Sequence, residues 1–295
     1  MDTFIQQLIN GLTLGCVYAV VALGYTMVYG IIQLINFAHG EVVMIGAMVA
    51  FSVITALAGS AVPPLIIVLL GILAAIPACA LVGYTVERVA YRPLRNAPRL
   101  APLITAIGIS IILQHLALLI WGRNFISFPQ IFPTQTYHFN ESANSATITN
   151  VQIVIMLLSM AMMAGLLLLV YKTRIGIAMR ATSQNPQVAG LMGININQVI
   201  SFTFVVGAGL GAMAGVMVGS YYGIAHYQMG FLLGLKAFSA AVLGGIGNLA
   251  GAVLGGILIG LIEAFGAGYM GDLTNVFFLN QWLPGFSGMC DSNAN

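Results

Sequence analysis

Three polar side chains that could do chemistry lie close together between two long apolar runs: Asn36, His39 and Glu41. A histidine and a carboxyl two positions apart can act as acid and base, and an amide beside them can bind a polar solute. A charged carboxyl at the centre of a membrane helix costs roughly 3 kcal/mol, so such groups usually face a bundle interior or a water path. We interpret residues 33–41 as a polar island at which an apolar segment breaks. The alternative is an ordinary cytoplasmic turn between two helices.

The composition places the whole chain in a membrane. Of its 295 residues, 60% are hydrophobic and only 5% are charged, whereas a soluble domain has about 25% charged residues. Apolar runs of about 20 residues without strand-like alternation favour helices over a barrel. Seven of the nine basic residues fall in two short segments, and the positive-inside rule predicts that both segments are cytoplasmic. These seven are Arg88, Arg92, Arg95, Arg99, Lys172, Arg174 and Arg180.

The apolar runs predict an all-α fold, a polytopic transmembrane bundle of about seven to eight membrane segments with interrupted or re-entrant helices. Pro77 should kink the third segment. The six clearest segments are expected at residues 12–32, 42–57, 65–86, 100–121, 151–171 and 199–222.

A second unusual stretch lies at residues 231–265, where Lys236 and Glu263 are the only charges. The sequence Ala-Val-Leu-Gly-Gly occurs there twice, at positions 241 and 252. We favour a helix break between Gly245 and Gly251, because Gly247-Asn248 is a turn signal; a continuous helix is the alternative. Paired interruptions in the two halves of a chain are typical of a transport site near the bilayer midplane. The path candidates are Asn36, His39, Glu41, Lys236, Asn248 and Glu263. For Lys236 and Glu263, pairing inside the bundle or anchoring at the membrane interface is the alternative that we favour over direct contact with the solute.

The second basic segment, residues 172–197, is too polar to span a membrane. Asn185 can cap a short helix that begins at Pro186 and ends at Gly193, with an apolar side formed by Val188 and its neighbours. Such a helix can dock into a groove on a soluble subunit. A helix lying on the lipid headgroups is the alternative.

The sequence lacks the motifs of several common enzymatic and metal-binding sites. Neither Lys172 nor Lys236 follows a glycine, so a phosphate-binding Gly-Lys-Ser/Thr loop is absent, and ATP hydrolysis by this chain is not expected. No zinc-binding HExxH motif occurs, and Cys16, Cys79 and Cys290 have no metal-ligand spacing. We predict that the chain is not an enzyme and needs no metal or cofactor of its own, and we expect no nucleic-acid partner.

Several motifs resemble one family of transport proteins in collinear order. The chain resembles the LivH-type permease of bacterial high-affinity branched-chain amino-acid ABC importers over roughly residues 5–270. The motifs that carry this resemblance are residues 24–32, 35–41, 87–93, 193–195, 236–238 and 241–247.

The resemblance implies a multi-subunit importer in the bacterial inner membrane. This permease would work with a second related permease, two cytoplasmic ATPases that use ATP, and a periplasmic or extracellular binding protein that delivers leucine, isoleucine or valine. Arg180, Ala189 and Gly193 would belong to the loop that meets an ATPase. A secondary transporter or channel for a small polar solute such as urea or an amide is the alternative.

The C-terminal part departs from this family pattern. Relatives usually finish with another apolar span, whereas the stretch after Gly271 is mixed and ends in a polar tail. We expect a permease domain at residues 1–271 and a divergent, poorly ordered tail at 272–295, with an altered reading frame or a truncation after about Asn275.

Overall fold

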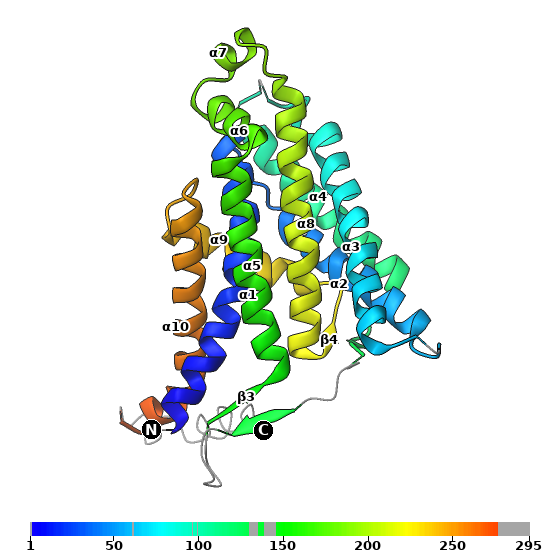
Figure 1. Cartoon of the computed structure of the whole chain (residues 1–295), viewed down its shortest axis with the longest axis vertical. Coiled ribbons are helices and arrows are strands. Elements are labelled where there is room, and N and C mark those ends of the chain that lie inside the picture. The colour runs from blue at the N-terminus through cyan, green and yellow to red at the C-terminus, as the bar shows by residue number, and fades with distance from the viewer. Residues whose placement is uncertain are drawn as a thin grey trace.

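The computed structural model describes residues 2–276 except positions 61, 96, 99, 130–134 and 139–145. The expected tail therefore lies mostly outside the described residues, although the last helix continues past position 272 to Val276. Helices make up most of the described chain (Figure 1). They are α1 (Asp2–Ile32), α2 (His39–Leu57), α3 (Pro64–Val86), the π-helix η1 (Glu87–Tyr91), α4 (Leu100–Trp121), α5 (Asn150–Lys172), α6 (Arg174–Gln184), α7 (Pro186–Leu191), α8 (Ile196–Tyr222), α9 (Met229–Leu243) and α10 (Leu249–Val276).

Seven described helices are long and apolar enough to cross a bilayer, and α9 is a shorter apolar helix of 15 residues. This confirms the polytopic helical bundle with about seven to eight membrane segments. The part of the chain that the structure describes also holds four short strands in two antiparallel pairs, β1 with β4 and β2 with β3. The strands are β1 (Ile126–Ser127), β2 (Thr136–His138), β3 (Thr147–Thr149) and β4 (Ile224–Ala225).

The helix boundaries differ from the sequence prediction in three places. α2 begins at His39, so His39 and Glu41 belong to the helix and not to the preceding loop. The segment 172–197 contains an additional helix, α6, before the predicted short one. The break between α9 and α10 falls at residues 244–248, with Gly245 and Gly247 at φ angles of +84° and +97°, and Gly251 lies inside α10.

Helix α1 is the centre of the bundle and packs most extensively on α10. Glycines permit this close approach: a Cβ atom on Gly15 would lie 2.7 Å from the Cα atom of Ile257, and one on Gly256 would lie 2.5 Å from the Cα atom of Ala19. In lipid, where apolar burial provides little drive for association, such small-residue contacts stabilise helix pairs through van der Waals packing.

Two groups of three consecutive helices, α1 to α3 and α8 to α10, make equivalent contacts and run in opposite directions. α1 contacts α10 and α9, just as α8 contacts α3 and α2, and α2 packs on α3 as α9 packs on α10. Exchanging α1 with α8, α2 with α9 and α3 with α10 therefore reproduces the contacts. Because α1 rises through the view in Figure 1 while α8 descends, the two groups form an inverted repeat, as in many secondary transporters.

The bundle has one basic end. Helices α6 and α7 lie at the top of Figure 1, whereas the N-terminus, β3 and β4 lie at the bottom. The first basic loop lies at the same end as α6, because Arg95 is hydrogen-bonded to Asn197 at the start of α8. We call the end that carries both loops the basic end.

Candidate functional site

The polar island connects α1 to α2 inside the bundle. Gln33, at a φ angle of +53°, ends α1, and residues 33–38 lead into α2. Asn36 is buried, and the hydroxyl of Tyr91 lies 3.1 Å from both its amide oxygen and the backbone oxygen of Ile35. The island is therefore attached to the π-helix at the end of α3.

His39 and Glu41 occupy the first turn of α2 and are both buried. Oε1 of Glu41 accepts hydrogen bonds from Ser110 at 3.0 Å and from Gln114 at 2.7 Å, both on α4. Oε2 of Glu41 and Nε2 of His39 have no hydrogen-bond partner among the described residues. Buried polar atoms without a partner are uncommon in folded proteins and often mark functional positions. Both side chains face the bundle interior, as the sequence predicted for polar groups in a membrane.

Helices α2 and α9 begin at the same place, with their N-termini in contact. A Cβ atom on Gly40 would lie 2.4 Å from the backbone oxygen of Gly230, and one on Gly230 would lie 2.8 Å from Oε2 of Glu41. A Cβ atom on Gly24 of α1 would likewise meet His39, at 2.2 Å from Nε2. Gly24 precedes the end of α1 by eight residues, so this junction lies about 12 Å inside the bundle from the basic end.

Lys236 and Glu263 form a second, separate cluster. Nζ of Lys236 lies 2.5 Å from Oε1 of Glu263, and the hydroxyl of Tyr18 donates to Oε2 of Glu263 at 2.9 Å. The pair joins α9 to α10, and Tyr18 adds α1.

Asn248 has a structural position at the basic end. Its side-chain oxygen accepts hydrogen bonds from the backbone N–H groups of Ala250 at 3.1 Å and Gly251 at 3.2 Å. It therefore caps α10 and satisfies N–H groups that a helix start leaves free. The six path candidates thus fall in three places: the island and α2, the Lys236 cluster, and the turn before α10.

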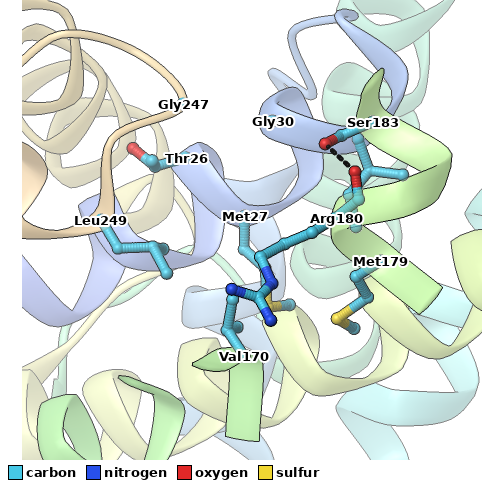
Figure 2. A pocket seen from close by; sticks show the side chains of 10 residues that line it. Thr26, Met27, Gly30, Val170, Met179, Arg180, Ser183, Gly247 and Leu249 are labelled. Carbon is cyan, nitrogen blue, oxygen red and sulfur yellow. Dashed lines mark hydrogen bonds between the residues drawn. The ribbon is translucent and has the colours of Figure 1, made fainter. Parts of the chain in front are cut away.

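A small pocket opens near this turn, between α1, α6 and the start of α10 (Figure 2). The hydroxyl of Thr26, which lines it, is buried and has no hydrogen-bond partner among the described residues. The side chain of Arg180 extends along the pocket, with its guanidinium carbon 5.4 Å from the centre of the Tyr171 ring. Arg180 therefore lies beside the bundle at the basic end.

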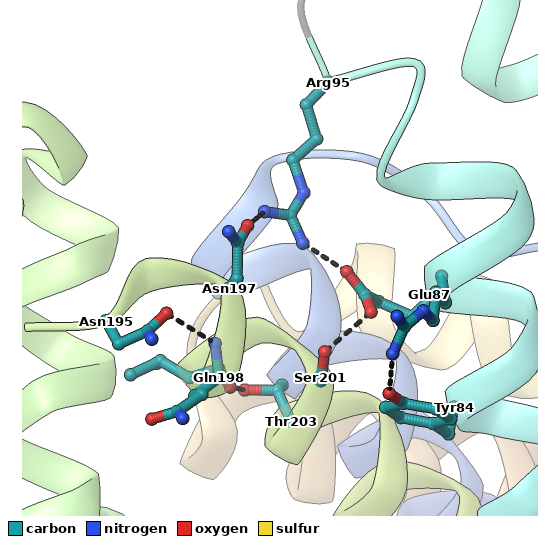
Figure 3. A network of polar contacts seen from close by, with 10 residues as sticks. Tyr84, Glu87, Arg95, Asn195, Asn197, Gln198, Ser201 and Thr203 are labelled. Atoms are coloured by element: carbon teal, nitrogen blue, oxygen red, sulfur yellow. Dashed lines mark hydrogen bonds and ion pairs between the residues drawn. The ribbon is translucent and has the colours of Figure 1, made fainter.

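A polar network at the basic end joins α3 to α8 (Figure 3). Glu87 is fully buried, forms an ion pair with Arg95 and accepts a hydrogen bond from Ser201 at 2.7 Å. Arg95 also donates to Asn197 at 2.7 Å. Burial lowers the pKa of Arg95, while the Glu87 carboxylate acts in the opposite direction. The charge of Arg95 is kept, because a guanidinium stays protonated in proteins.

Helix α7 has the predicted caps at both ends. Asn185 accepts a hydrogen bond from the backbone N–H of Val188 at 3.1 Å, and Pro186 is the first helical residue. The N–H groups of Gly193 and Ile194 bond the carbonyls of Gly190 and Ala189 respectively, both at 3.1 Å. These bonds, with Gly193 at a φ angle of +85°, form a Schellman motif. Ala189 is buried, and Gly193 ends the helix as predicted.

Sequence reasoning missed the partners of these polar groups. Ser110 and Gln114 lie four positions apart in a mostly apolar helix and so share one helix face, which was a signal present in the sequence. Glu87 adjoins the first basic segment, and the sequence carries no sign that it is buried or that Tyr18 lies beside Glu263.

The fold and these sites define a class: a polytopic helical membrane protein with an inverted repeat and buried polar groups at its helix interruptions, features that are typical of transport proteins. The chain belongs to the family described as "Branched-chain amino acid transport system / permease component", whose model matches residues 7–282.

Similar proteins carry names that agree with this family. The chain is 48% identical over 270 residues to the Pseudomonas aeruginosa "High-affinity branched-chain amino acid transport system permease protein BraD", covering 91% of this chain and 88% of that protein. It is 45% identical over 268 residues to LivH of Escherichia coli K12, a permease of the same description, covering 90% and 87% of the two chains. No solved structure gives a significant match.

Proposed function

We propose that this chain is the membrane permease of an ABC importer for branched-chain amino acids in a bacterial inner membrane. The family membership and the names of its relatives support the transport role and the substrate. Because basic loops stay in the cytoplasm, the basic end would face the cytoplasm and the N-terminus the other side. An external binding protein would deliver leucine, isoleucine or valine, a second related permease would complete the membrane part, and two ATPases would supply the energy.

The observation that carries the ATPase partnership is the exposed apolar side of α7. Leu191 is 88% exposed and Met192 80% exposed, and both lie in the capped segment that projects from the basic end (Figure 1). Large apolar side chains held outside a folded surface mark interaction sites, and a helix with such a face fits a groove on a partner. The same helix supports the expected coupling position of Ala189 and Gly193.

A continuous set of contacts leads from α7 to the island. The chain passes from α7 into the start of α8, where Asn197 bonds Arg95 and Ser201 bonds Glu87. Glu87 begins the π-helix that ends at Tyr91, and Tyr91 holds Asn36. Movement of α7 by an ATPase would therefore displace the junction between α1 and α2 without chemistry in this chain. Rocking of one repeat against the other would then alternate access to the two sides.

Co-purification of the permease with its ATPases tests this function. Replacing both residues, Leu191→Ser with Met192→Ser, should reduce ATPase recovery and ATP-driven uptake of labelled leucine at least tenfold. Val89→Ser is the matched control, because Val89 is 71% exposed at the same end but lies in the π-helix. Full ATPase recovery with the double variant would contradict docking at α7.

The alternative is a transporter or channel that works without ATPases. Reconstituted permease that takes up urea, an amide or an amino acid down a gradient, with no ATPase present, would favour this alternative. Uptake that strictly requires ATP, the ATPases and the binding protein would support the importer.

A further inference from the structure

The Lys236–Glu263 pair lies near the middle of the membrane. Glu263 follows the start of α10 by 14 residues and Tyr18 precedes the end of α1 by 14, which places each about 21 Å from the basic end. Lys236 precedes the end of α9 by seven residues, and its long side chain reaches toward Glu263. Because the hydrocarbon core is about 30 Å thick, these depths place both charges within the core and not at the basic end.

The Lys236–Glu263 pair is partly exposed, whereas Tyr18, which contacts both side chains, is buried. Tyr18 is almost completely buried; its hydroxyl donates to Glu263 and lies 3.4 Å from Nζ of Lys236, which sits 5.7 Å from the centre of the Tyr18 ring. The side chains of Lys236 and Glu263 are 42% and 32% exposed. A charged pair exposed at this depth cannot face lipid cheaply, so this surface faces water or protein in the working molecule.

The other half of the inverted repeat has no counterpart of this pair. Lys236 is the eighth residue of α9, and the eighth residue of α2, its counterpart, is Gly46. Gly46 packs on Ala212 of α8, and α3, the counterpart of α10, carries no charged residue. One half of the molecule therefore builds the same helix packing without charges at these positions.

We propose that Lys236 and Glu263 form a binding station for the zwitterionic head of the transported amino acid. This rests on the proposed transport function and names the residues that receive the substrate. The ammonium of Lys236 binds the α-carboxylate, and the carboxylate of Glu263 binds the α-ammonium. Leu232, one turn before Lys236 and 65% exposed, and Ile259, one turn before Glu263, offer apolar contact to the branched side chain.

The charge balance of the station explains which solutes it accepts. In the empty station, the charges of Lys236 and Glu263 neutralise each other. When a zwitterion is bound, each side chain pairs with the opposite charge of the solute, and the net charge of the station stays zero. A solute with only a carboxylate or only an ammonium leaves one protein charge unpaired at membrane depth, which is costly. Urea and simple amides supply no charges to replace the broken pair. The station therefore selects α-amino acids.

Uptake by the reconstituted complex of permeases, ATPases and binding protein tests the station. Lys236→Met and Glu263→Gln, made singly, should each reduce ATP-driven uptake of labelled leucine at least tenfold while the subunits still co-purify. Ser239→Ala is the matched control, because Ser239 is exposed on the same helix and bonds only its own helix backbone. Normal uptake by both variants would overturn the station but leave the importer function intact. Failure of the unaltered complex to import leucine would overturn the importer function itself.

A photoactivatable diazirine analogue of leucine provides the direct readout. Irradiation of the complex during turnover should attach it to peptides of α9 and α10 near Lys236 and Glu263, and Lys236→Met should reduce this labelling at least tenfold. Labelling confined to other helices would overturn the proposal. Loss of the second permease from either single variant would assign the pair to a dry contact between subunits, and would also overturn it.

Discussion

At the scale of single residues, the best-defined polar group is Glu87. Its carboxylate is fully buried and is held by Arg95 on one side and by Ser201 on the other. A buried ion pair adds little net stability, but removing one partner leaves an uncompensated charge. The pair therefore fixes the relative position of α3 and α8 at the basic end of the bundle.

Replacing Arg95 tests how far the stability of the protein depends on its ion pair with Glu87. Arg95→Gln should lower the stability of the purified permease by roughly 3 kcal/mol, because Glu87 then keeps a buried charge without its cation. Thermal unfolding in detergent, followed by loss of the monodisperse peak, measures the change. Arg88→Gln removes the same charge from an exposed neighbouring side chain and should change stability by less than about 1 kcal/mol. Equal losses in the two variants would show that the ion pair has no special role.

At the scale of elements, the contact between the starts of α2 and α9 decides the geometry of the interior. Each helix has a glycine as its second residue, and the two backbones touch there. A pair of helices that both begin inside a membrane leaves N–H groups directed at the interior, which suits a path for a polar solute. Bulk at this contact would force the helices apart.

A single methyl group tests this contact. Gly40→Ala should destabilise the protein by about 1–3 kcal/mol, because its Cβ atom would lie 2.4 Å from the backbone oxygen of Gly230. Gly108→Ala, inside α4 with no atom within 4 Å of the added Cβ, should be neutral or stabilising. Thermal inactivation in detergent compares the two. A stable Gly40→Ala protein would contradict the close packing of α2 on α9.

At the scale of the whole molecule, the inverted repeat and the basic end fix how the chain lies in the membrane. The start of α1 and the end of α10 lie on the side opposite to α6 and α7 (Figure 1). Both interruptions lie within the repeat: the island precedes α2 in one half, and the turn at residues 244–248 follows α9 in the other. The molecule therefore presents both basic loops on one side and its N-terminus on the other.

Cysteine labelling in intact cells tests this orientation. In a background with Cys16, Cys79 and Cys290 replaced by alanine, Phe4→Cys should react with a membrane-impermeant maleimide added outside. Leu191→Cys should react only after the membrane is opened. The opposite pattern would reverse the orientation that the positive-inside rule predicts. Both side chains are exposed, so burial does not limit either reaction.

The sequence by itself determined the class of fold, most of the helix positions and the interrupted segments, because apolar run length, capping residues and Gly-Asn turns are local signals. It also placed the short helix at Pro186–Leu191 and the break before α10. Only the tertiary structure decided which polar groups meet. Glu41 bonds residues on α4, and Tyr18 bonds Glu263 across 245 positions. Membrane helices are apolar on nearly all sides, so hydrophobic patterning does not decide which side of a helix faces the bundle. Packing between small residues and pairing of polar side chains decide it instead.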